Sequence, residues 1–132
     1  MITFVDTNIL LDVFLPDPKF GEHSCNSLEK AYQKGSLIIN KIIYAELAPK
    51  FNSREFLDTT LSKIGIRIVS IDKNSAYRAG QIWKQYKKAG GKRNRILADF
   101  LIGSHSESQA DRLLTRDRGF YKKYFKNLHI MV

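Results

Sequence analysis

The sequence predicts an α/β fold built around a parallel β-sheet. Short apolar runs, typical of buried strands, alternate along the chain with segments whose apolar residues recur at the 3.6-residue helical period. The 132 residues suffice for one ordinary domain, and 43% of them are hydrophobic. Because no Pro/Gly/Ser-rich linker, repeat or low-complexity tract interrupts the sequence, we expect residues 1–132 to form a single domain.

The first elements are expected to be a strand, two helices and a second strand. Ile2–Val5 is a short apolar run that predicts a strand, and the apolar stretch Ile9–Leu15 predicts the first helix. A second helix is expected over Glu22–Lys34, where Gly35 ends it. Leu37–Ile39 then predicts the second strand.

The middle of the chain is expected to contain two helices and a third strand. Asn40 can cap a short helix that carries Glu46, and Pro49 should end this helix. A further helix is expected over Ser53–Ile64, and it leads into a strand over Ile66–Val69.

A long amphipathic helix opens the last part of the chain. Asp72 is expected to cap this helix, and Gly90-Gly91 should stop it after Lys88. The remaining elements are expected to be a helix, a strand, a loop and an edge strand, over Arg95–Ser108, Arg112–Thr115, Arg116–Phe120 and Leu128–Val132. Strands that alternate with helices in this way indicate βαβ units, whose strands run parallel.

Four carboxylates lie at positions where a simple solvent-exposed role is not expected. Asp6, Glu46, Asp99 and Asp117 lie in or directly after apolar sequence: ITFVD, IIYAELA, RILADFLIG and LLTRD. In open α/β sheets, ligands bind beyond the carboxyl ends of the strands, where Asp6 and Asp117 are expected. Taken singly, each acid could instead be a buried carboxylate paired with a lysine or an arginine. Asp12 could face the same edge in support, although this is the less favoured role for it.

Acids gathered at one edge of a sheet favour a divalent cation. Like charges that lie close together repel each other, and a metal ion removes that penalty. An all-oxygen ligand set favours Mg²⁺ or Mn²⁺ over Zn²⁺, and a lone Cys25 excludes a cysteine-rich zinc site. His23, His105 and His129 share no spacing suited to metal-free RNA cleavage, so we expect them to be surface or packing residues.

The four acidic segments, taken in order, resemble those of a known family. The segments are VDTN at residues 5–8, YAEL at 44–47, LADFLI at 97–102 and TRD at 115–117. In this order and spacing they resemble a PIN domain, specifically the VapC-type toxins of type II toxin–antitoxin systems. The resemblance covers essentially the whole chain. One departure is GSHS at residues 103–106, where the family more often continues with an alanine-rich helix.

The resemblance implies a PIN-like three-layer α/β/α sandwich around a parallel sheet, and a Mg²⁺- or Mn²⁺-dependent endoribonuclease. It implies that Asp6, Glu46, Asp99 and Asp117 form the catalytic, metal-binding quartet. Asn8 and Thr115 match polar positions that support the acids, or they are a helix cap and a strand-end hydroxyl. A bound ion would hold a phosphate oxygen, lower the pKa of water and offset charge in an in-line displacement, leaving 5′-phosphate and 3′-hydroxyl ends. A cognate antitoxin and a homodimer are further implications.

The net charge of +9 would attract a polyanion such as RNA. Two basic groups, one before Asp99 and one around Asp117, are candidates for contacting the RNA substrate, although each residue could equally be a solvated charge. The candidates are Lys84, Lys87, Lys88, Lys92, Arg93, Arg95, Arg116 and Arg118. Aromatic residues interleave with the second group and could stack on unpaired bases, but packing is expected for two of them: Phe120, Tyr121, Tyr124 and Phe125.

Two other functions remain open. One is a catalytically silent PIN-like scaffold that binds RNA or protein, and the intact acidic set disfavours it. The other is a phosphoryl-transfer enzyme with Asp6 as nucleophile, which Asn8 disfavours because that class carries a second aspartate at this place. No apolar run approaches the length of a membrane span, about 18 residues, and the N-terminus reads as a strand rather than a signal peptide. We therefore expect a soluble, cytoplasmic protein.

Overall fold

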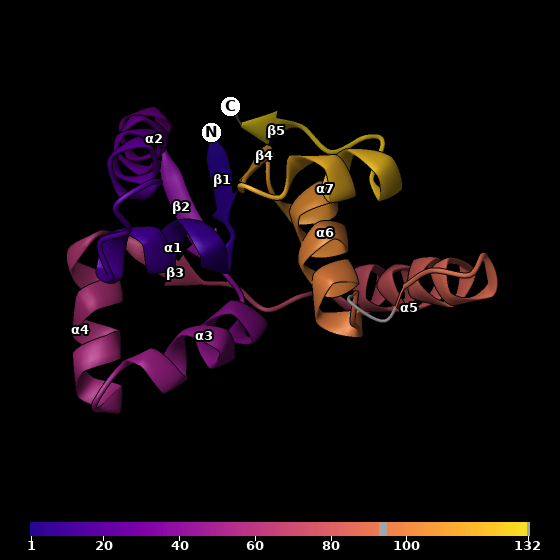
Figure 1. Ribbon diagram of the computed structural model, residues 1–132, viewed down its shortest axis with the longest axis horizontal. Coiled ribbons are helices and arrows are strands. Elements are labelled where there is room, and N and C mark those ends of the chain that lie inside the picture. Colours follow the sequence, from indigo (N-terminus) through magenta and orange to yellow (C-terminus); the bar gives the residue numbers. More distant parts are fainter. Residues whose placement is uncertain (93–94, 132) are drawn as a thin grey trace.

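A computed structural model describes residues 1–92 and 95–131 (Figure 1). Its strands are β1 (Ile2–Val5), β2 (Ser36–Ile39), β3 (Ile66–Ile68), β4 (Arg112–Leu114) and β5 (Ile130–Met131). Its helices are α1 (Thr7–Phe14), α2 (Gly21–Lys34), α3 (Lys41–Leu47), the 3₁₀ turn η1 (Ala48–Lys50), α4 (Arg54–Lys63), α5 (Lys73–Lys88), α6 (Leu97–Gln109) and α7 (Arg118–Tyr124). Within these ranges no helix is both long and apolar enough to cross a membrane.

The strands form one five-stranded sheet in the order β3-β2-β1-β4-β5, and every pair is parallel. The register places Phe4 of β1 opposite Ile38 of β2 and Leu113 of β4. The chain builds outward from β1 through β2 to β3, then returns to place β4 on the other side of β1. The point where the order reverses is therefore the gap between β1 and β4, the usual place for a ligand in such sheets.

The core lies on and around the sheet. Phe4, Ile38 and Leu113 are almost completely buried, as are Phe100 of α6 and Phe125 after α7. Gly103 allows close packing, since a Cβ on it would lie 2.2 Å from the Phe125 ring. The α/β prediction is confirmed, because helices pack around a central sheet that is parallel throughout.

Several helix boundaries follow from the signals in the sequence. Asp72 caps α5 by accepting a 2.7 Å hydrogen bond from the Ser75 N–H, and Asn40 caps α3 in the same way through Ile43. Gly35 ends α2 with φ +150°, and a Cβ there would lie 2.1 Å from the Met1 carbonyl oxygen. These caps satisfy backbone groups that a helix end leaves without partners.

The prediction of a loop over Arg116–Phe120 was wrong. Helix α7 begins at Arg118, and Asp117 stands at its N-cap position. Phe120, Tyr121 and Tyr124 fall on one face at helical spacing, and the first two are buried, so burial of this face outweighs the turn signal of Gly119. Other differences lie at the ends of elements: α6 begins at Leu97 instead of Arg95, and β3 and β4 each stop one residue early. Strand β5 is shorter than Leu128–Val132, of which Val132 lies outside the described residues.

Candidate functional site

The four acids follow the carboxyl ends of three neighbouring strands or lie on a helix beside them. Asp6 follows β1 directly, and Asp117 follows β4 after Thr115 and Arg116. Glu46 lies on α3, which begins where β2 ends, and Asp99 lies in the first turn of α6. The fold thus brings all of them to the side of the sheet where β1 and β4 diverge.

Asp6 is the buried centre of this site, with 6% of its surface exposed. Its carboxylate accepts hydrogen bonds from the Thr7 N–H at 2.7 Å, the Thr115 hydroxyl at 2.7 Å and the Asn8 amide at 3.3 Å. Burial nevertheless raises the pKa of Asp6 from 3.8 to about 6, and the negative charges of Glu46 and Asp117 contribute to the rise. Asp6 is therefore a carboxylate that its surroundings leave short of positive charge.

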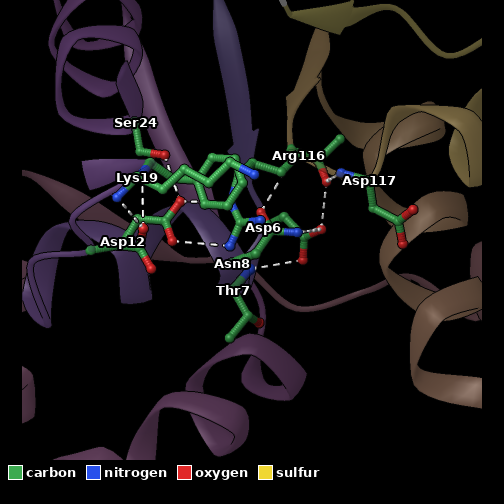
Figure 2. A network of polar contacts seen from close by, with 11 residues as sticks. Asp6, Thr7, Asn8, Asp12, Lys19, Ser24, Arg116 and Asp117 are labelled. Carbon is green, nitrogen blue, oxygen red and sulfur yellow. Dashed lines mark hydrogen bonds and ion pairs between the residues drawn. The ribbon is translucent and has the colours of Figure 1, made fainter. Parts of the chain in front are cut away.

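Thr115 and Asn8 link Asp6 to the loop that carries Asp117. Figure 2 draws Asn8 together with Asp6, Arg116 and Asp117. The Thr115 hydroxyl donates to Asp6 and accepts from the Asp117 N–H at 3.0 Å. The Asn8 side chain donates to Asp6 and accepts from the Arg116 N–H at 3.2 Å. Both residues predicted to support the acids thus contact Asp6 and fix its position relative to Asp117.

The other three acids each have an internal partner. Glu46 accepts a 2.6 Å hydrogen bond from the Thr7 hydroxyl, and Asp99 accepts one of 3.0 Å from the Ile96 N–H. Asp117 forms a two-pronged ion pair with Arg95, whose Nη2 lies 3.1 Å from Oδ1. In Figure 2 the Asp117 side chain accordingly points away from Asp6. For Asp117, pairing with an arginine was the alternative that the sequence left open.

Tyr121 lies within electrostatic reach of the whole set. It is 2% exposed, and burial raises the pKa of its hydroxyl, as do the negative charges of Asp6, Asp99, Asp117 and Glu46. Burial also raises the pKa of Asp99, and the charge on Asp117 adds to that rise. The sequence placed Tyr121 among aromatics that stack or pack; its place one helical turn after Asp117 was the signal for proximity to the acids.

A second carboxylate network holds Arg116. Asp12 of α1 is 4% exposed and accepts from Arg116 Nε at 2.7 Å, from Nη2 at 3.0 Å and from the Ser24 hydroxyl at 2.7 Å. The Arg116 guanidinium also lies 4.1 Å from the centre of the Phe20 ring. Figure 2 shows how the Arg116 side chain spans from the loop before Asp117 to Asp12 on α1. Asp12 thus has a structural role in holding the loop.

A family model described as the PIN domain matches residues 3–126. The chain belongs to the PIN domain family. The resemblance drawn from the spacing of the four acidic segments is confirmed at this level.

Solved structures share the fold of this PIN domain. The structure of VapBC2 from Rickettsia felis bound to a promoter DNA fragment contains a chain with 23% identity and a TM-score of 0.74, over 99% of this chain and 98% of that one. A chain of VapBC-1 from nontypeable Haemophilus influenzae has 19% identity and a TM-score of 0.73, over 99% of this chain and 97% of that one. A chain of FitAcB from Neisseria gonorrhoeae has 20% identity and a TM-score of 0.65, over 100% of this chain and 97% of that one. No curated protein sequence matches the chain.

The donor set of this PIN domain fits a hard divalent cation. All four side chains offer carboxylate oxygens, and Asp6 is buried and short of positive charge. Across residues 1–92 and 95–131, however, no three Asp, Glu, His or Cys side chains converge closely enough to hold an ion as they stand. One of the four acids, Asp117, already has a cationic partner in the Arg95 guanidinium.

The basic residues predicted to contact RNA are divided between open and paired positions. Lys84 and Lys88 lie on α5, Lys87 lies 3.7 Å over the Trp83 ring, and Arg118 begins α7. Arg95 and Arg116 are bound to Asp117 and Asp12, and Lys92 precedes Arg93, which lies outside the described residues. Of the histidines, His105 is fully buried against Phe4, as expected of a packing residue.

Proposed function

We propose that this PIN domain is a Mg²⁺- or Mn²⁺-dependent endoribonuclease of the VapC type, the toxin of a type II toxin–antitoxin pair. The observation that carries the proposal is Asp6, a buried carboxylate at the point where the strand order reverses. It is hydrogen-bonded to Thr115, and the negative charges of Glu46 and Asp117 help to raise its pKa. A structural acid in such a place would be expected to have a basic partner, as Asp12 has.

Asp6, Glu46, Asp99 and Asp117 are the residues that would hold the ion. When bound, such an ion supplies Lewis-acid stabilisation of charge at phosphorus and makes water more acidic. The protein contributes the positions of its own groups: Thr115 and Asn8 fix the Asp6 carboxylate, and Thr7 orients Glu46. Arg95 pairs with Asp117 and so holds a guanidinium beside the acids, where it would bind a phosphate oxygen of the substrate.

The proposed partners follow from the family and from the neighbouring structures. VapBC pairs contain a toxin and an antitoxin, so we propose that this chain also binds a cognate antitoxin. We propose separately that it forms a homodimer. The RNA substrate and a cytoplasmic place of action belong to the same proposal.

Cleavage of single-stranded RNA by the purified, antitoxin-free protein tests this function. We expect Mn²⁺ or Mg²⁺ to support cleavage and a chelator to abolish it. Asp99→Asn should lower the rate by more than about 100-fold, because losing a residue that only supports a metal ligand already costs about 10- to 100-fold. Glu29→Gln, an exposed acid on α2, is the matched control and should cleave normally. Cleavage that survives both the chelator and Asp99→Asn would rule the function out.

A further inference from the structure

A cavity of about 590 Å³ opens beside Asp117, between the end of α5 and α7. Its walls include Tyr86, Lys92, Arg95, Phe120, Lys123 and Tyr124. Arg95 belongs both to this wall and to the acid site, since its guanidinium pairs with Asp117 and lies 4.2 Å from the centre of the Phe120 ring. Whatever occupies the cavity is therefore one side chain away from the fourth acid.

The wall of the cavity is built from fixed parts. The Tyr86 hydroxyl donates to the Lys92 carbonyl at 2.6 Å, and the Gly91 N–H donates to the Tyr86 carbonyl at 2.9 Å. A Cβ on Gly91 would lie 2.5 Å from the Tyr86 ring, so the chain passes as close to that ring as a glycine allows. The ring of Tyr124 meets the Tyr86 ring edge-on at 5.5 Å. This packing sets the place of Lys92 at the rim.

The charge and surface of the cavity select one class of occupant. Lys92, Arg95 and Lys123 are cationic, while none of the described lining residues is acidic. The half-buried Tyr124 ring supplies apolar surface in the wall, and Lys123 Nζ lies 5.4 Å from its centroid. Phe120 is buried beneath the Arg95 guanidinium. Aromatic rings next to lysines are the means by which proteins hold unpaired bases and their phosphates. A volume of this size lies within the range of small-ligand sites, about 300 to 1,000 Å³.

We propose that this cavity is a subsite for one unpaired nucleotide of the RNA substrate, adjacent to the bond that is cleaved. Its base packs against the Tyr124 ring, and Lys92 and Lys123 bind its phosphate. The subsite rests on the proposed ribonuclease function and gives one unpaired nucleotide of its substrate a defined binding position, because a base paired in a duplex cannot enter.

Filling the cavity tests the subsite. Gly119 lines the cavity in α7, and a Cβ there meets nothing within 4 Å, so Gly119→Leu places a side chain in the open space. Gly80 on α5 has equally open surroundings and does not line this cavity, which makes Gly80→Leu the matched control. Both are made in the Asp99→Asn background, and binding of a fluorescent single-stranded oligonucleotide is measured by anisotropy, with thermal melting to verify folding.

Gly119→Leu is expected to weaken RNA binding by about 5- to 100-fold, the range of one base stack, and Gly80→Leu to leave it unchanged. Equal binding by the two variants would overturn the subsite. A second, milder comparison sets Lys123→Gln against Lys126→Gln. Only Lys123→Gln should reduce the slope of log affinity against log salt, by about one. Equal slopes for the two variants would contradict the subsite. If wild-type protein does not cleave RNA, the ribonuclease function fails, whereas normal cleavage with equal binding by both glycine variants removes the subsite alone.

Discussion

Asp6→Asn is expected to abolish RNA cleavage and at the same time to stabilise the metal-free protein. Burial and neighbouring acids raise the pKa of Asp6 from 3.8 to about 6, so the ionised carboxylate destabilises the folded state at neutral pH. The folded protein binds more protons than the unfolded chain between these two values, so stability falls as pH rises through this window and is level above it. The free energy of unfolding should rise by up to about 3 kcal/mol at pH 7 in the variant.

Urea unfolding in the presence of a chelator, at pH 4 and at pH 7, measures this effect. The difference between Asp6→Asn and wild type should be small at pH 4 and large at pH 7. Asp72→Asn is the matched control, because the cap bond from Ser75 lowers the pKa of Asp72 instead of raising it. That variant should cleave RNA normally and gain no stability. A less stable Asp6→Asn protein at pH 7 would show that Asp6 is a structural residue with a satisfied charge.

Asp12→Asn is expected to weaken both the fold and cleavage, although Asp12 belongs to none of the four acidic segments. Asp12 is buried, whereas the Arg116 side chain is 34% exposed. When the pair is broken, water can therefore still solvate part of the Arg116 charge. We expect the free energy of unfolding to fall by about 2 kcal/mol. Cleavage should fall by about 10- to 100-fold, because Arg116 fixes the loop between Thr115 and Asp117.

A matched ion pair separates these two effects. Glu107→Gln removes the charge from the Arg78–Glu107 pair, whose atoms are 2.7 Å apart and which joins α5 to α6. This variant should lose stability and keep its turnover number under conditions where it remains folded. The same comparison made with Asp12→Asn should show a reduced turnover number at full folding. Normal turnover by folded Asp12→Asn would mean that the Asp12–Arg116 pair stabilises the domain without positioning the site.

The parts of this site that the sequence predicts are those set by local pattern. Asp6 and Asp117 each follow an apolar run, and a parallel sheet brings such positions to one edge, so their placement could be foreseen from periodicity alone. Asp72 and Asn40 behave as caps for the same reason, since a cap needs only its own helix.

The internal partners of the acids could not be predicted in this way. The Asp12–Arg116 pair joins residues 104 positions apart, and the Arg95–Asp117 pair joins residues 22 apart, so each depends on how the elements pack. Helix α7 was missed because Gly119 outweighed the aromatic spacing in the sequence, while burial decides in the fold. Local pattern therefore locates the acids, and long-range packing decides which of them are already neutralised.

Titration of the chelator-treated protein with Mn²⁺, followed by the loss of the free Mn²⁺ electron paramagnetic resonance signal, tests most directly whether the acids form a metal site. Wild-type protein should bind Mn²⁺ saturably, Asp6→Asn should bind it at least about 10-fold more weakly, and Glu29→Gln should match wild type. An absence of saturable binding by the wild type, or equal binding by wild type and Asp6→Asn, would contradict the proposed site.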